Sequence, residues 1–562
     1  MRRFHVSAFL SILLAAVVLS PLAHSQVAAN RSLSNKKSLG SEYLPLDHWA
    51  YPVIERSIAK GAIPNQSWGL RPWTRMAVAD LLEQRRRRAS EFAQDESSLE
   101  LVRILEQEFA AELDEIEGDD VSNAQVTSLY TRMQGIGGDS LRDGYHLGQT
   151  VVNDYGRPYG NGFNNVTGGS FSFDYDWFTV AMRGEFQRAA AGTIYPASAI
   201  KTLDAKDMTN GLVAPSTASQ THVDFLDTYA GAIFKSWDFT AGKQSIWWGP
   251  TDFSSMTFTN NIDPMWMGQL NRTVPFRFPW IFKYLGDVRM DFFMARTQGH
   301  VYPPKPWIHG EKTSVMPTKN LEFGFARTTV WTGVDRPFSF RQLVNTYFSV
   351  GDYVGSNQTL TDPGDRRGEF DMRYRVPGVR NWLTVYMDSL VDDDPSPLAA
   401  PHNAAIRPGF YISHFPGLDK LDLRVEGAYT QVNANNRLGL FFYWDANYHD
   451  SYTNESMLIG DWVGREGIGG EAAATYWLTP LRSIEVSYRR HTIAHDFIPG
   501  GGNSEDYAAN TSLHLTGSLF VTGGVQFESY LFPILENGRN HNFATTVGLT
   551  LYPGSGKKFG RQ

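Results

Sequence analysis

The densest group of side chains with binding chemistry lies between Gly242 and Gly286. It holds the run Gly-Lys-Gln-Ser-Ile-Trp-Trp-Gly-Pro at 242–250, the run Asn-Asn-Ile-Asp-Pro at 260–264 and an aromatic stretch from Pro275 to Trp280. Sugars offer hydroxyl groups for hydrogen bonds and C–H faces that stack on indole rings, and this mixture supplies both. The candidate saccharide-binding residues are Trp247, Trp248, Asn260, Asn261, Asp263 and Trp266. An equally open alternative is membrane-surface anchoring combined with a loop that folds inward and plugs a barrel.

A second block, Gly138-Asp139-Ser140-Leu141, resembles the opening motif of GDSL-type esterases. Such an enzyme also needs a late Asp-x-x-His pair, because a serine hydroxyl without a base is a weak nucleophile. The sequence after His491 contains no such pair, and the whole sequence contains no His-Glu-x-x-His, no phosphate loop and no cysteine. We therefore predict no catalytic residue, no metal site and no cofactor.

The N-terminus predicts export. Arg2 and Arg3 precede an apolar run over 6–19, and small residues at Ala23 and Ser25 fit the −3 and −1 positions of a cleavage site. The expected organisation is a signal peptide at 1–25, a linker at 26–45, a helical periplasmic region at 46–128, an outer-membrane barrel at 129–553 and a C-terminal tail at 554–562.

Composition narrows the possible partners. The formal charge is −8, so nucleic acid is not expected as a partner, because phosphate binding requires a basic surface. Charged residues make up 20% of the chain and the mean hydropathy is −0.32. A membrane span must therefore be built from strands, since only helices and closed barrels satisfy all backbone groups in lipid.

Helical periodicity is confined to the N-terminal part. Apolar residues recur every three or four positions from Trp49 to Ile58, from Met76 to Leu82 and from Leu99 to Ile116. Gly61 fits the C-terminal end of the first helix and Thr74 begins the second. The four arginines at 85–88 are interpreted as a solvated face, with contact to anionic lipid or cell-wall polymer as the alternative.

Beyond Tyr130 the apolar period becomes two, as in strands. Segments 369–376, 421–429 and 484–489 each alternate apolar residues with Asp, Glu, Arg or Ser. Very short turns, such as Tyr175-Asp176 and Thr479-Pro480, separate strand pairs that are otherwise joined by long connections. This asymmetry is typical of outer-membrane barrels, whose apolar face meets lipid while the charged face is expected to line a hydrated lumen.

Aromatic residues near the strand ends predict girdles at the two membrane interfaces. They are Tyr175, Trp177, Trp237, Trp247, Trp248, Trp382, Tyr476 and Trp477. An opening strand near 143–154, eight hairpins and a closing strand near 542–552 predict an all-β transmembrane barrel of about 18 antiparallel strands. With an even number of strands, the start of the first strand and the end of the last strand both lie on the periplasmic side. Under this strand order, a strand over 237–248 carries Trp247 and Trp248 to the outer mouth.

The blocks at 242–250 and 261–264, together with Tyr43–Pro52 and Leu70–Arg75, resemble the Wzi capsule-assembly family. The resemblance implies an outer-membrane barrel of similar strand number, a small periplasmic helical part and lectin-like binding of capsular polysaccharide or exopolysaccharide. Outer-membrane lipid and the barrel insertion machinery are the other partners that it implies.

Residues 46–82 also resemble a single S-layer homology module, on Trp49, Ile54-Glu55, Gly61, Ile63, Arg71-Pro72 and Thr74-Arg75. That resemblance implies cell-wall polymer as a further partner. The favoured hypothesis is a non-enzymatic polysaccharide-binding barrel at the bacterial outer membrane. The charged lumen is also typical of a porin for sugars or other small solutes, which is the alternative hypothesis. A barrel hydrolase that uses Ser140 is the third hypothesis.

Overall fold

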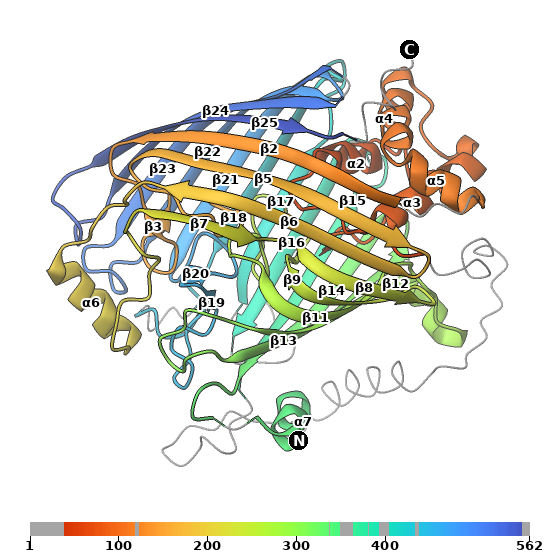
Figure 1. Ribbon diagram of the computed structural model, residues 1–562. Coiled ribbons are helices and arrows are strands. Elements are labelled where there is room, and N and C mark those ends of the chain that lie inside the picture. The colour runs from red at the N-terminus through yellow and green to blue at the C-terminus, as the bar shows by residue number, and fades with distance from the viewer. Residues whose placement is uncertain are drawn as a thin grey trace.

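The computed structural model describes residues 39–118, 123–336, 338–348, 364–379, 381–392, 404–432, 438–516 and 518–553. The predicted signal peptide, most of the predicted linker and the predicted C-terminal tail lie outside the described residues. The described chain forms a closed antiparallel barrel with a group of helices at one end (Figure 1). No helix in this part of the chain is long and apolar enough to cross a membrane.

The helices at the barrel end pack around one apolar core, because each has its apolar residues on one side. Thr74 caps the second helix by accepting a hydrogen bond from the backbone N–H of Ala77 at 3.2 Å. The predicted third helix is divided at Phe109, whose buried ring lies under the Arg75 guanidinium. The described helices are α2 (Ala50–Ala59), α3 (Arg75–Arg87), η1 (Ala89–Glu91), α4 (Glu96–Glu108), α5 (Ala110–Glu117), α6 (Ala197–Asp207), η2 (Trp280–Leu285) and α7 (Phe340–Phe348).

The barrel wall is continuous, and each strand pairs with its neighbours antiparallel. β7 and β8 both pair with β6 and are separated only by Leu226 and Asp227, so together they occupy one strand position. The described residues therefore contain 18 barrel strands, and the predicted fold class is confirmed. The wall strands are β2 (Asn123–Gly137), β5 (Gly162–Tyr175), β6 (Phe178–Ala189), β7 (Gln220–Phe225), β8 (Thr228–Phe234), β9 (Trp237–Gln244), β11 (Met265–Arg272), β12 (Asp287–Arg296), β13 (Trp307–Thr318), β14 (Leu321–Trp331), β15 (Asp365–Arg375), β16 (Leu383–Asp392), β17 (Ala404–Ile412), β18 (Leu421–Tyr429), β21 (Gly467–Thr479), β22 (Arg482–Ile493), β23 (Gly502–Thr516), β24 (Leu519–Leu531) and β25 (Asn540–Leu551).

The opening strand is β2, not the expected segment 143–154. β2 begins at Asn123, inside the stretch expected to be helical, and its many Ser, Thr and Gln residues weaken the apolar alternation. Residues 143–154 instead lie within the β2–β5 connection, which carries only β3 (Arg142–Asp143) and β4 (Gly148–Gln149). β25 closes the barrel against β2. β2 therefore begins, and β25 ends, at the end of the barrel where the short turns and the N-terminal helices lie. Short turns face the periplasm in outer-membrane barrels, so we expect this to be the periplasmic end.

Apolar side chains are exposed on the barrel wall and charged ones are buried, the reverse of a water-soluble sheet. On β6, Met182 and Phe186 are each 44% exposed, whereas Arg183 and Glu185 are buried. Successive strand residues face opposite sides, so the exposed face is the outer one and meets lipid.

The predicted aromatic girdle is correct only in part. Tyr175, Trp177 and Tyr476 are exposed on the outside, but Trp247, Trp248 and Trp477 are buried. The Trp477 indole nitrogen donates to Asp422 at 2.6 Å, so this ring faces the interior of the barrel.

We expect arginine at a central lipid-facing position to destabilise the barrel more than arginine at its edge. Val525 lies at the middle of β24 and is 45% exposed, whereas Leu551 is the last residue of β25. In phospholipid vesicles, Val525→Arg should lower the free energy of unfolding by about 2–4 kcal/mol and Leu551→Arg by about 0–1 kcal/mol. Guanidinium unfolding followed by tryptophan fluorescence measures both, and equal effects would contradict the assigned outer face.

Candidate functional site

The Trp-Trp-Gly-Pro segment lies inside the barrel. β9 ends at Gln244, and the connection 245–264 turns into the lumen before β11 begins at Met265. There β10 (Trp247–Trp248) pairs antiparallel with β1 (Leu70–Arg71) of the N-terminal region. The prediction that one strand carries both tryptophans to the outer mouth is therefore wrong. We call residues 245–264 the inward loop.

Trp248 is packed on all sides within the barrel. Its ring is fully buried and meets Phe258 and Phe293 edge-on, with centroid distances of 5.2 and 5.4 Å. The indole N–H donates to Asp291 of β12 at 3.1 Å. The ring also contacts the wall at Gly310, where an added Cβ would lie 2.9 Å from the indole. Trp248 therefore fills the space between the inward loop and the wall.

Gly249 allows the chain to turn after the tryptophans. Its φ of +144° is one that other residues rarely adopt, and an added Cβ would lie 2.5 Å from the Ser255 hydroxyl. The Gly249 N–H donates to the Gly69 carbonyl at 3.0 Å, extending the pairing of the inward loop with the N-terminal region.

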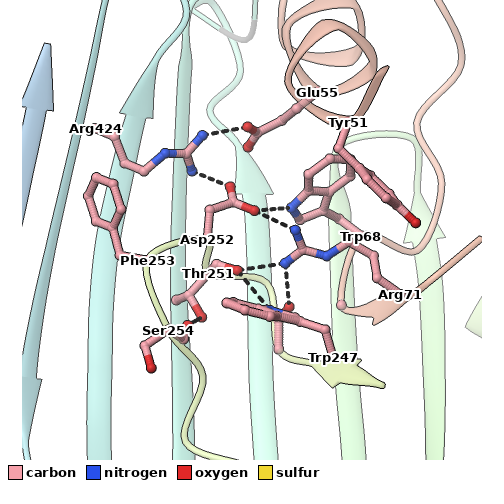
Figure 2. Close-up of polar contacts among 12 residues, drawn as sticks. Tyr51, Glu55, Trp68, Arg71, Trp247, Thr251, Asp252, Phe253, Ser254 and Arg424 are labelled. Carbon is pink, nitrogen blue, oxygen red and sulfur yellow. Dashed lines mark hydrogen bonds and ion pairs between the residues drawn. The ribbon is translucent and has the colours of Figure 1, made fainter. Parts of the chain in front are cut away.

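Asp252 is the centre of a largely buried ionic cluster, which we call the ionic lock (Figure 2). Its carboxylate pairs with Arg71 of the N-terminal region at 2.5 Å and with Arg424 of β18. The Trp68 indole N–H donates to the same carboxylate at 3.2 Å, and Arg424 also pairs with Glu55 of α2. The ionic lock therefore joins the helices, the inward loop and the barrel wall.

Wall carboxylates also hold the backbone of the inserted segments. Glu426 of β18 accepts hydrogen bonds from the Asp252 and Phe253 N–H groups at 2.9 and 3.2 Å, and Asp388 of β16 accepts one from Met256 at 2.8 Å. These buried carboxylates therefore accept hydrogen bonds from the backbone of the inward loop.

A second group of buried ion pairs lies on the wall. Lys312 pairs with Glu369 at 2.6 Å and with Asp371 at 2.5 Å, and all three side chains are fully buried. The prediction of charged residues on the inner face is confirmed, but the expected hydrated lining is wrong at these positions. Apolar residues of the inward loop and of the connection 430–466 form a core inside the barrel instead.

Three other candidate residues join the inward loop to neighbouring connections or to β9. The buried Asn261 amide donates to Gln149 at 2.9 Å and to the Leu458 carbonyl at 3.0 Å. The Asn260 carbonyl accepts a hydrogen bond from the Tyr155 N–H at 2.6 Å, and Asp263 pairs with Lys243 at 2.8 Å.

Trp266 is separate from the other candidates. It lies on β11 with 56% of its surface exposed, on the face opposite to the buried Met265 and Met267. The structure therefore buries Trp247, Trp248, Asn260 and Asn261, pairs Asp263 with Lys243 of β9, and leaves Trp266 exposed on the outside of the barrel. β11 thus separates Trp266 from the other candidates, although all six lie within the same dense stretch of the sequence.

A histidine cluster fixes the outer connections to one another. The buried His146 ring lies between two carboxylates, with Nδ1 2.9 Å from Asp143 and Nε2 2.8 Å from Asp207 at the end of α6. Arg465 pairs with Asp207 at 2.6 Å. Burial by itself would lower the pKa of His146, but the two carboxylates outweigh it and raise the pKa to about 9.

Ser140 is buried and its hydroxyl donates to the Asn161 side-chain oxygen at 2.8 Å. This hydroxyl therefore bonds to an amide, where a GDSL-type mechanism needs a base.

The family model for capsule assembly protein Wzi matches residues 132–545. Among solved structures, the chain is similar to Escherichia coli Wzi, described as an outer-membrane protein involved in group 1 capsule assembly and as a carbohydrate-binding β-barrel. The TM-score is 0.65 at 16% identity, with 92% of this chain and 99% of that chain covered. Pseudomonas aeruginosa OccK7 (OpdD) and OprD each give a TM-score of 0.40 at 10% identity, with 76% of this chain covered and 99% and 95% of theirs. No curated protein sequence matches the chain.

We expect Asp252→Ala to destabilise the protein by about 3–5 kcal/mol, because it leaves Arg71 buried without its carboxylate and removes one of the two carboxylate partners of Arg424. Unfolding by guanidinium in detergent micelles measures this change. Arg87→Ala is the control: it removes an exposed pair with Glu83 at 2.7 Å and should cost less than about 0.5 kcal/mol. Similar costs for the two variants would show that the ionic lock contributes little.

The His146 cluster should make stability depend on pH. The pKa of His146 is higher in the folded protein than its ordinary value of 6.5, so protonation stabilises the fold fully below about pH 6.5 and this contribution is lost as the pH rises through about 9. His146→Gln should therefore cost roughly 3 kcal/mol at pH 6 and clearly less at pH 10. Melting temperatures of both proteins across this range test it, and a pH-independent difference would refute the assigned charge.

Proposed function

The chain belongs to the capsule assembly protein Wzi family, and we propose that it binds capsular polysaccharide or exopolysaccharide and helps attach it at the cell surface. The observation that carries this proposal is the filled barrel. An inward loop closed by the ionic lock supports a holding role and disfavours the porin alternative, because packed side chains of the inward loop and of the connection 430–466 occupy part of the barrel interior.

The tryptophans of the inward loop are too deeply buried to contact a polymer, so the binding surface must lie elsewhere. We place it on the outer connections, where three aromatic rings form a column. Tyr302 is 45% exposed and stacks on His449 with a centroid distance of 4.6 Å. His449 stacks in turn on Trp444 at 5.5 Å, with an interplanar angle of 12°.

This aromatic column has the chemistry of a saccharide platform. Its exposed end is a phenol ring that can stack on the C–H face of a sugar while its hydroxyl hydrogen-bonds. Burial lowers the pKa of His449, so the supporting ring is neutral at pH 7. The Arg336 guanidinium lies 5.7 Å from the Tyr302 ring centre and gives the platform positive charge, which suits acidic sugars.

Two partners implied by the sequence remain predictions. Contact with the barrel insertion machinery follows from the fold class alone. Cell-wall tethering is disfavoured, because Glu55 and Arg71 carry the resemblance to an S-layer homology module and both form ion pairs within the ionic lock.

Removal of the protein should release polysaccharide into the medium while secretion continues. Complementation with Tyr302→Ala should restore surface polysaccharide only weakly, and the purified variant should bind extracted polysaccharide about tenfold less tightly, as expected for loss of one stacking ring. Immunoblots of cells and medium, and titration in detergent, measure the two effects.

Trp177→Ala is the matched control, because Trp177 is 53% exposed but lies in a turn at the periplasmic end. It should bind and complement like the parent protein. Unchanged surface polysaccharide after deletion would refute the proposed function, whereas normal binding by Tyr302→Ala would refute only the platform.

A further inference from the structure

We propose that the connection between β11 and β12 is a membrane-interface anchor that binds phospholipid of the periplasmic leaflet. This connection, residues 273–286, joins the end of β11 at Arg272 to the start of β12 at Asp287. It therefore lies at the end of the barrel that carries the helices and the short turns. In Figure 1 it projects outward from the barrel rim, near the label of β12. We call it the rim segment.

The rim segment is attached to the outside of the wall. The backbone groups of Phe276 and Val288 exchange two hydrogen bonds, of 3.1 and 2.8 Å, which extend the sheet by one bridge beside β12. Asp291 of β12 contacts Trp248 and Gln269 in the interior. Alternate strand residues face opposite sides, so the even-numbered residues of β12, such as Val288 and Met290, face outward.

Part of the rim segment covers this outward face. Phe276, Phe278 and Leu285 pack against Val288, Met290 and the neighbouring wall residues, and both wall residues are almost completely buried by the contact. The segment thus extends the lipid-facing surface of the barrel at its periplasmic edge.

The rest of the rim segment presents large apolar side chains to the surroundings. Trp280 is 88% exposed, Ile281 72%, Tyr284 71% and Phe282 44%, all within the single short helix η2. Gly286 then returns the chain to the wall with φ +73°, where an added Cβ would lie 1.7 Å from the Met316 carbonyl oxygen. The return is therefore close to the wall and holds the exposed side chains at the rim.

Three features select lipid over a protein partner or a second copy. The apolar surface is continuous with the part of the wall that already meets hydrocarbon. Tryptophan and tyrosine are the residues that prefer the boundary between headgroups and acyl chains. Lys283 lies among the apolar residues, 5.2 Å from the Tyr284 ring, so its charge can reach lipid phosphates while the rings enter the acyl region, whereas Arg277 pairs with Asp287 at 2.6 Å.

The absence of cysteine from the chain makes a direct test possible. Ile281→Cys in the full-length protein is labelled with a polarity-sensitive nitrobenzoxadiazole probe and reconstituted into phosphatidylcholine–phosphatidylglycerol vesicles. Emission should shift to the blue, and lipid carrying a shallow nitroxide should quench the probe roughly threefold more than at a water-exposed control position. The control is Lys319→Cys, in the exposed turn between β13 and β14 at the same end of the barrel.

Iodide in the aqueous phase gives the opposing readout. If iodide quenches the label at position 281 as strongly as the label at 319, and lipid nitroxide does not distinguish them, the proposal is overturned. Protection that appears only at high protein density in the membrane would assign the surface to a second copy and would also overturn it. Neither result depends on polysaccharide binding, so the proposed function is tested separately.

Discussion

The structure depends on how the charges on the inner face of the barrel are satisfied. A wall of 18 strands encloses a lumen wide enough for an aqueous channel, and its inner face carries arginines and carboxylates on many strands. Here the lumen is filled, so an unpaired charge would cost several kcal/mol. Asp252 meets this constraint for the N-terminal region and for the wall, because Arg71 and the Trp68 indole of that region and Arg424 of β18 all converge on its carboxylate.

Because of this arrangement, the inward loop and the N-terminal region fill the lumen cooperatively. The inward loop has no regular structure of its own beyond two residues that pair with the N-terminal region, and that region in turn donates backbone N–H groups to Glu322 of the wall. Each inserted segment therefore supplies partners for the other. Docking of the helices and insertion of the loop belong to one folding step, because either segment alone would leave buried charges and backbone groups unpaired.

The sequence predicted the features that depend on local periodicity. Alternation over 369–376 and 421–429 identifies wall strands and their charged inner faces, and short turns between them identify the periplasmic end. β2 was missed because its small polar residues blur the same alternation. β11 was missed because the eight residues Met265–Arg272 lie between two loops that are richer in recognisable groups.

The candidate site was harder to predict for a physical reason. Trp247, Trp248 and Asn261 were identified as important from their chemistry, but the direction in which a connection folds depends on its partners. In the ionic lock, Arg71 and Asp252 are separated by 181 positions, and Glu55 and Arg424 by 369. No local spacing signals such pairs. The same limit applies to the aromatic column, because its rings come from two connections and form a continuous surface only when the fold stacks them.

The filled lumen gives the outer surface a mechanical property that suits a holding role. Tyr302 rests on His449, which belongs to the same connection as Tyr443. The Tyr443 hydroxyl donates to the Met256 carbonyl of the inward loop at 2.5 Å, and the Met256 N–H is held by Asp388 of the wall. A pull on the platform is therefore resisted by the packed interior and, through the ionic lock, by the periplasmic helices. The proposed platform thus rests on rigid, packed elements, which hold a binding site more precisely than an unsupported surface loop does.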